Sequence, residues 1–234
     1  MICRAERNTD LIYSPSLASN EDFRQGRAMN FDMLNLDFAL AFLDQVGVLV
    51  FAISGGIVAV RAKMDPLGVL VLSFLPALGG GTLRDLILDA PIFWLTDTSF
   101  LWMVLLGAVI SWVFGARVDE FKPIRWADAV GLALFAVAGT AKALGLGYSI
   151  TIAVIMGGVT ASAGGLLRDI VAGREPMLLK QDIYATAALL GGLGYALSDH
   201  AGLSFELSTL IGFTLAFSLR ACAIRFGWSL PQAR

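Results

Sequence analysis

GGGTLRD, at residues 79–85, recurs later in the chain as GGLLRD, at residues 164–169. Gly80 and Gly164 are 84 positions apart, and sliding the chain by that offset aligns further residues without a gap. The additional aligned pairs are Asp44 with Asp128, Val46 with Val130, Gly47 with Gly131, Phe51 with Phe135, Ala52 with Ala136, Gly55 with Gly139 and Ala77 with Ala161. The sequence therefore contains an internal duplication, and the two copies are expected to fold alike.

The composition indicates an integral membrane protein. Hydrophobic residues make up 57% of the chain and charged residues 15%, and the mean hydropathy is +0.74, whereas about 25% of the residues in a soluble domain are charged. We expect helices, because a backbone in lipid must satisfy its own hydrogen bonds. Continuous apolar runs such as residues 100–114 contradict a β-barrel, whose strands alternate over about ten residues. No basic patch with interleaved aromatics indicates a nucleic-acid partner.

Seven apolar runs are candidates for membrane helices, each of which takes roughly 20 residues to cross the hydrocarbon core. They cover approximately residues 42–61, 66–88, 98–116, 126–144, 148–172, 182–199 and 203–222. Residues 1–41 form a polar extension of mixed charge that we expect to be disordered, and residues 223–234 form a tail. The transmembrane domain, residues 42–222, then comprises repeat one at about 42–116, repeat two at about 126–199 and a seventh helix at about 203–222.

Lysine and arginine gather in the loops after the first, third and fifth helices and in the C-terminal tail. The residues concerned are Arg61, Lys63, Arg117, Lys122, Arg125, Arg174, Lys180, Arg220, Arg225 and Arg234. The positive-inside rule places these regions in the cytoplasm, so the N-terminus is expected outside the cell (inner) membrane and the C-terminus inside. Each repeat has an odd number of helices, and the second must therefore enter from the opposite face. The predicted fold is an all-α membrane protein with two inverted three-helix repeats plus one extra helix.

Glycines cluster in the second helix of each predicted repeat. They are Gly79, Gly80, Gly81, Gly157, Gly158, Gly164 and Gly165. Glycine permits a bend and Pro76 removes a backbone donor, so kinks in these helices could turn carbonyl oxygens toward a path between the repeats. Close packing of helices through small residues is the competing interpretation, and the recurrence in both copies favours the functional one.

Each repeat also carries an Arg-Asp pair where a membrane helix ends, and a guanidinium at membrane depth must be paired. Neighbouring residues on a helix do not face each other, so we expect partners from another helix. The expected structural pairs are Asp44 with Arg84 on the outer side and Asp128 with Arg168 on the inner side. Asp85 and Asp169 are then the better candidates for facing a cation.

Lys142 interrupts the fourth apolar run and corresponds to Val58 in the first copy. A lone lysine inside a span is a candidate functional residue, here a movable electrostatic barrier near the outer mouth; snorkelling to the interface as a static anchor is the alternative. Ser54, Thr82 and Thr140 could line a wet path, although hydroxyls also bond their own helix backbone.

Neither a nucleophile–base pair nor a metal-ligand cluster stands out in the sequence. We therefore expect no enzymatic activity, no bound metal and no cofactor. Cys3 and Cys222 lie near opposite ends of the chain and suggest no disulfide framework.

GGGTLRD, GGLLRD with the following AGREP (residues 172–176), and AGTAKAL (residues 138–144) resemble motifs of the trimeric intracellular cation (TRIC) channels and their bacterial relatives, many of which are labelled glycine transporters. The resemblance covers about residues 42–220. It implies a homotrimer among membrane lipids, with an ion path through each protomer that is permeable to K⁺ and other monovalent cations such as Na⁺. In animal members a Lys-Glu-Val motif contributes to phosphoinositide binding; Lys142 resembles its lysine, but Ala143 and Leu144 replace the other two residues, which puts that regulation in doubt.

Two classes of function remain open at this point. In a passive cation channel, carbonyls and hydroxyls would replace part of an ion's hydration shell. In a secondary transporter of a small zwitterion such as glycine, half-helix N-termini would hold the carboxylate during an alternating cycle. The absence of an obvious buried acid pair for proton coupling favours the channel.

Overall fold

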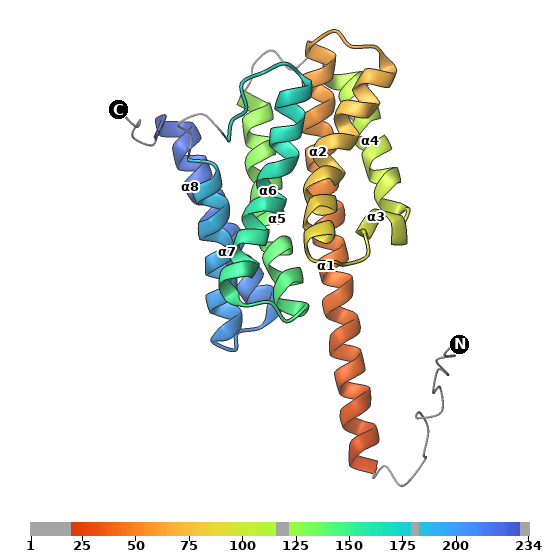
Figure 1. Ribbon diagram of the computed structural model, residues 1–234, viewed down its shortest axis with the longest axis vertical. Helices are drawn as coiled ribbons and strands as arrows, with labels where there is room; N and C mark the ends of the chain where they lie inside the picture. Colours follow the sequence, from red (N-terminus) through yellow and green to blue (C-terminus); the bar gives the residue numbers. More distant parts are fainter. Residues whose placement is uncertain (1–19, 116–121, 179–182, 230–234) are drawn as a thin grey trace, which may run out of the picture. The chain divides into compact units, whose positions relative to one another are not determined.

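A computed structural model of the protein describes residues 20–115, 122–178 and 183–229, with side chains from Ala41 onward except at residues 122 and 123 (Figure 1). The chain divides between Phe38 and Ala39 into two units. The second unit begins at Ala39 and contains the contacts described next.

The described residues form eight helices. Their bounds are α1 (Asn20–Arg61), α2 (Pro66–Ile87), α3 (Phe93–Thr96), α4 (Ser99–Phe114), α5 (Lys122–Gly145), α6 (Ile150–Val171), α7 (Ala185–His200) and α8 (Phe205–Phe226). The all-α prediction is confirmed, and the short helix α3 is an addition to it. In Figure 1, α5 and α6 lie between α2 on one side and the α7–α8 pair on the other, and α4 packs beside α2.

Five of the described helices are long and apolar enough to cross a membrane. They are the Ala41–Arg61 part of α1, α2, the Ile124–Gly145 part of α5, α6 and α8. The helices α4 and α7 occupy two more of the predicted runs but have only 16 residues each. A multi-pass membrane protein is therefore well supported, while seven crossings stay a prediction.

The ends of the chain differ from the expected bounds. Of the polar extension at residues 1–41, residues 1–19 lie outside the described residues, and α1 begins at Asn20 where disorder was expected. Polar residues such as Glu and Arg are good helix formers, so polarity alone does not predict disorder. At the other end α8 continues to Phe226, beyond the predicted end at 222, and stops where Gly227 adopts a left-handed φ of 67°.

Local sequence explains where α2 begins. The Asp65 side chain accepts a hydrogen bond of 2.7 Å from Gly68 N, which satisfies one of the unpaired donors of the first turn. Pro66 occupies the first helical position, where its missing N–H is not needed. These residues fix the turn between α1 and α2, and thereby the position of the glycines further along α2.

The centre of the bundle is a reciprocal contact between α1 and α5. The rings of Phe51 and Phe135 stack with centroids 5.3 Å apart. Both side chains are buried, and because lipid tails are as apolar as these rings, the contact stabilises the bundle through close packing and not through exclusion of water. A Cβ on Gly47 would meet the Phe135 ring, and one on Gly131 would meet the Phe51 ring. Each copy therefore supplies one phenylalanine and one glycine, and each glycine makes room for the other copy's ring.

A second reciprocal contact joins α2 and α6. A Cβ on Gly80 would collide with the carbonyl oxygen of Thr160, and one on Gly164 would collide with the carbonyl oxygen of Pro76. Positions 80 and 164, and positions 76 and 160, are related by the same offset of 84 residues. The two backbones cross in direct contact at this point, as small residues allow in membrane helices.

The glycines expected to kink α2 and α6 lie inside uninterrupted helices, and none of them has a positive φ. At every one of the seven, an added Cβ would meet a neighbouring side chain or backbone atom closer than real Cβ atoms come. Those glycines are Gly79, Gly80, Gly81, Gly157, Gly158, Gly164 and Gly165. The structure thus gives them the packing role that was the competing interpretation, because close helix crossings leave no space for a methyl group.

Candidate functional site: two buried charge clusters

The first charge cluster consists of Asp44 on α1, Arg84 and Asp85 on α2, and Lys142 on α5. Arg84 Nε donates a hydrogen bond of 2.7 Å to Asp85 Oδ1, and Lys142 Nζ donates one of 2.8 Å to the same oxygen. Asp44 Oδ1 lies 3.8 Å from Arg84 Nη1, which makes an ion pair without a hydrogen bond. Two carboxylates therefore face two cations at this end of α2.

The second charge cluster consists of Asp128 on α5, Arg168 and Asp169 on α6, and Ser54 on α1. Arg168 Nε donates to Asp169 Oδ1 at 2.9 Å, and its Nη1 reaches Asp128 Oδ1 at 2.6 Å and Ser54 Oγ at 2.7 Å. All four side chains are buried. Charge-assisted bonds of this length are roughly twice as strong as neutral ones. Beyond the end of α6, partial burial lowers the pKa of Arg174, against the opposing influence of Asp169.

The second oxygen of each α2 or α6 aspartate holds the segment that follows its helix. Asp85 Oδ2 accepts from Phe93 N at 3.0 Å, and Asp169 Oδ2 accepts from Met177 N at 3.0 Å. Both oxygens of each carboxylate are therefore occupied by protein donors. The sequence predicts that Asp85 and Asp169 face a cation, whereas in this conformation their carboxylates hold the chain back against the helix ends.

Each arginine bonds its own neighbour in sequence as well as an acid on another helix. Direct pairing of adjacent residues was not expected, because they point in different directions around a helix. The arginine side chain is long enough to overcome this, and it brings Nε of Arg84 back to Asp85 and Nε of Arg168 back to Asp169. A guanidinium has five N–H donors, so its outer nitrogens are still directed at the acid on α1 or α5.

Fewer hydrogen bonds hold the first cluster than the second. Among the described residues, both terminal nitrogens of Arg84 lack a hydrogen-bond partner, but only one terminal nitrogen of Arg168 does. Ser54, which bonds Arg168, corresponds to Ala138 under the offset of 84 residues. Alanine has no hydroxyl to offer Arg84, so the first cluster is the looser of the two.

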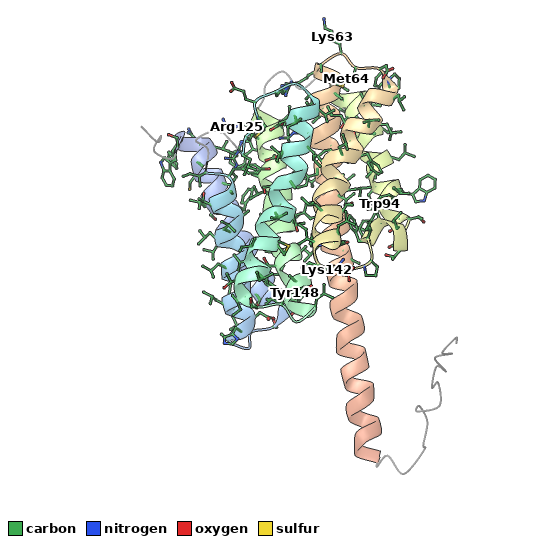
Figure 2. All side chains as sticks on the ribbon, viewed as in Figure 1. Lys63, Met64, Trp94, Arg125, Lys142 and Tyr148 are labelled. Carbon is green, nitrogen blue, oxygen red and sulfur yellow. The ribbon has the colours of Figure 1, made fainter. Side chains whose placement is uncertain are left out.

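Lys142 connects the two halves of the chain, because it stands on α5 and bonds Asp85 on α2. Its side chain is 26% exposed, so part of it lies at the surface of the protein. Nearby, the Tyr148 hydroxyl donates to the carbonyl oxygen of Leu88 at 3.2 Å. Figure 2 shows Lys142 and Tyr148 toward the end of the bundle opposite Lys63. In this conformation Lys142 is paired rather than snorkelling free of partners.

The hydroxyls expected to line a path are bonded within the protein. Thr82 Oγ1 donates to Leu78 O at 2.7 Å and accepts from Trp94 Nε1 at 2.9 Å. Thr140 Oγ1 donates to Ala136 O at 2.8 Å. Such bonds to the preceding helical turn are the alternative that the sequence left open. Ser54 differs from these threonines because it bonds an arginine on another helix.

Sequence reasoning missed Arg220, which it grouped with the cytoplasmic cations. Arg220 is fully buried on α8, its Cζ lies 4.9 Å from the Tyr184 ring centroid, and its Nη1 donates to Ile183 O at 3.3 Å. The available signal was its position inside the last apolar run, at residues 203–222. An arginine inside a span requires a partner in the bundle interior.

Comparison with known proteins places this arrangement in a family. A family model described as "Glycine transporter" matches residues 41–116 and, separately, residues 125–200. The "UPF0126 membrane protein" of Vibrio cholerae is 40% identical over 203 residues, covering 84% of each chain. The "UPF0126 inner membrane protein YadS" of Escherichia coli is 39% identical over 196 residues, covering 81% of this chain and 94% of YadS.

A crystal structure described as the TRIC trimeric intracellular cation channel orthologue from Rhodobacter sphaeroides superposes with a TM-score of 0.79 at 38% identity, covering 81% of this chain and 99% of the other. The chain belongs to the TRIC family. A second structure, described as "Structural basis for conductance through TRIC cation channels", superposes with a TM-score of 0.74 at 34% identity. The match covers 83% of this chain and 97% of the other. The resemblance inferred from the repeated GGGTLRD and GGLLRD motifs is confirmed, and the TRIC proteins that match are ion channels.

Proposed function

We propose that the protein is a monovalent cation channel, permeable to K⁺ and Na⁺, with one ion path in each protomer of a homotrimer. Similarity to TRIC channels over 81% of the chain supports the proposal. The observation that carries it is the first charge cluster, in which a partly exposed Lys142 is held 2.8 Å from buried Asp85. No resident cofactor or metal is part of the proposal, and the permeant ion is the transported substrate.

The inverted-repeat arrangement belongs to the same proposal. Figure 2 places Lys63 and Met64, just after α1, at the same end of the bundle as Arg125, near the start of α5. It places Lys142, near the end of α5, toward the other end. Opposite directions for α1 and α5, the reciprocal contacts and the double match of the family model are what inverted repeats produce. With α8 added, the chain would cross the membrane seven times.

The distribution of Lys and Arg orients the protein, with the N-terminus outside the inner membrane and the C-terminus in the cytoplasm. Lys63 and Arg125 then mark the cytoplasmic end of the bundle. The second charge cluster faces the cytoplasm and the first faces the outside. The tighter cluster thus lies at the inner mouth and the looser one at the outer mouth.

Lys142 supplies a gate at the outer mouth. While it bonds Asp85, its positive charge stays on the cation's path and the carboxylate is compensated. When Lys142 swings away from Asp85, the carboxylate keeps Arg84 and Phe93 N as partners but loses one compensating charge. The mouth becomes more negative and a barrier to cations is removed at the same time. Membrane voltage, or an anion or lipid head group that attracts the ammonium, would shift this equilibrium.

A secondary transporter of glycine, or of a similar zwitterion, is the second candidate. It is favoured by the description "Glycine transporter" that the matching family model carries. In that case the arginines would act on a substrate carboxylate, which requires them to exchange partners during each cycle. Arg168 already has three side-chain acceptors, Asp128, Asp169 and Ser54, so release of its partners would be costly.

Reconstitution of the purified trimer separates the two functions. A channel should give unitary currents in planar bilayers bathed in KCl. A carrier should give saturable glycine uptake into proteoliposomes and no unitary currents in the bilayers. Saturable uptake with no unitary current under any voltage would overturn the channel proposal.

Lys142→Gln tests the gate in the same bilayers. This change keeps a polar side chain of similar length and removes the charge, so open probability or conductance should rise. Lys63→Gln is the matched control, because Lys63 is exposed and lies at the other end of the bundle. If Lys142→Gln and Lys63→Gln both behave like the unmodified protein at all voltages and salt concentrations, Lys142 is a static anchor.

A further inference from the structure

The two charge clusters differ in how their carboxylates are compensated. Each contains two buried aspartates; in the first they pair with two cations, Arg84 and Lys142, and in the second both pair with the single guanidinium of Arg168. The position equivalent to Lys142 in the first copy is Val58, which is buried and apolar. Arg174 acts on Asp169 from the following loop, but it is partly exposed and so partly screened by water. In the second cluster one buried guanidinium is therefore shared by two carboxylates.

Arg220 on α8 is the buried cation beside the second cluster. It reaches that cluster through two residues, each next to one of its aspartates. Arg220 Nη2 lies 3.8 Å from Met177 Sδ, and Met177 N is the donor to Asp169. Its guanidinium also covers the ring of Tyr184.

The Tyr184 hydroxyl adjoins the other aspartate of the second cluster. A Cβ built on Gly165 would lie 2.6 Å from the Tyr184 hydroxyl oxygen and 3.4 Å from Asp128 Oδ1, so the two groups border the same small space. Both side chains are at most 1% exposed. A cation over the face of an aromatic ring is attracted by about 2 kcal/mol when the pair is desolvated. Arg220 thus fixes the ring whose hydroxyl faces the cluster.

The equivalent segment of the first copy is held differently. Phe93 and Phe100, which correspond to Met177 and Tyr184, pack edge to face with centroids 4.7 Å apart. The segment between them forms α3 and is tied to α2 by the Trp94 to Thr82 hydrogen bond. Repeat one therefore secures its own segment. In repeat two the corresponding residues are bridged by an arginine from α8, the helix outside both copies.

We propose that Arg220 is a positioning residue, through which α8 holds Met177 and Tyr184 beside the second charge cluster and sets how readily this end of the protein opens. The expected effect on conduction rests on the proposed function. The expected effect on access to the buried cluster does not, because it can be measured without any current. The helix left over from the duplication becomes the element that controls one mouth.

The test measures access to the second cluster directly. Ser54→Cys places a thiol beside Arg168, in a protein whose natural cysteines are replaced by Cys3→Ser and Cys222→Ser. Reaction with a water-soluble maleimide in detergent then reports opening, without any need for conduction. Arg220→Gln should raise the labelling rate about tenfold, which corresponds to 1.4 kcal/mol, and Arg220→Lys should give an intermediate rate because the charge remains but the planar fork is lost.

Two controls separate positioning from general destabilisation. Arg225→Gln removes an exposed arginine from the last turn of the same helix and should leave labelling unchanged. Gly212→Ala destabilises α8 at another contact, since its Cβ would crowd Tyr195 and Val137. It should lower the melting temperature without the tenfold rise in labelling. Equal labelling of intact trimers carrying Arg220→Gln and of the parent protein would overturn the proposal.

If Arg220→Gln yields no trimer, the labelling rate of Arg220→Lys is used instead. A labelling rate for Arg220→Lys equal to that of the parent protein overturns the proposal. Open probability in bilayers should rise with the labelling rate across these variants. Absence of current from the unmodified protein would refute the channel function while the labelling result still stands for or against Arg220.

Discussion

Asp128 and Arg168 should be coupled more strongly than Asp44 and Arg84, although the two pairs occupy equivalent positions. Asp128 Oδ1 and Arg168 Nη1 are 2.6 Å apart and hydrogen-bonded, whereas Asp44 Oδ1 and Arg84 Nη1 are 3.8 Å apart without a hydrogen bond. At an effective dielectric constant of about 20, Coulomb's law gives roughly 6 and 4 kcal/mol for these distances. The coupling energies should therefore differ by at least about 2 kcal/mol, before the hydrogen bond is counted.

Two double-mutant cycles measure this difference. One combines Asp128→Asn with Arg168→Gln, and the other combines Asp44→Asn with Arg84→Gln. Each single change leaves a buried charge without its partner and costs about 3–5 kcal/mol, and each double change should be milder than the sum of its singles. For a chain of this size about 2 kcal/mol corresponds to roughly 4–8 °C in melting temperature, which thermal unfolding of the purified trimer can resolve.

The reasoning fails if the two cycles give the same coupling energy, or if either pair is additive. Additivity at Asp128 and Arg168 would mean that the hydrogen-bonded pair contributes nothing beyond its separate side chains. Equal coupling would mean that the extra 1.2 Å in the first cluster has no energetic consequence, the difference being that between 3.8 and 2.6 Å. The single variants also serve as folding controls, because size-exclusion chromatography shows whether the trimer persists.

Three further changes test the packing and the mouths. Gly80→Ala should lower stability by about 1–3 kcal/mol, because its methyl meets a rigid carbonyl oxygen of α6, while Gly79→Ala meets only a leucine methyl and should be milder; equal melting temperatures would contradict the crossing. Ser54→Ala should lower the melting temperature through the lost hydrogen bond to buried Arg168, by about 1–3 kcal/mol, and an unchanged value would show that the bond is dispensable. Tyr148→Phe removes the bond to the carbonyl oxygen of Leu88, worth about 0.5–1.5 kcal/mol; if this bond helps to hold the proposed Lys142 gate closed, single-channel records should show a rise in open probability of several-fold at most, and a fall would contradict that role.

The approximate positions of the helices, and the pairing of each repeated arginine with an acid on another helix, could be predicted from the sequence. Membrane helices must be long and apolar, so their extents are visible in composition, and the duplication identifies which acid belongs with which arginine. Asp128 lies beside Arg168 and Asp44 beside Arg84, as the offset suggested. The asymmetry at Lys142 was visible for the same reason, because Val58 stands in its place in the first copy.

The contacts of individual atoms could not be predicted. A repeated glycine indicates a special position, but only the distance between helices decides whether it bends a backbone or makes room for one, and at Gly164 it makes room. The bond between Lys142 and Asp85 joins the two copies, so no internal comparison points to it. Arg220 was misplaced because charge counting assigns every basic residue near a terminus to water, although the final apolar run continues past it.

The stacked Phe51 and Phe135, each seated on a glycine from the other copy, have an evolutionary consequence. In an ancestor whose single three-helix chain met a second identical chain, one mutation would have changed both halves of this contact at once. After fusion the halves mutate separately, and a bulkier residue at Gly131 can be accommodated only by a smaller one at Phe51. Homologous sequences should therefore show compensating exchanges between positions 51 and 131, and between 135 and 47. Each copy would carry a record of the substitutions accepted by its counterpart.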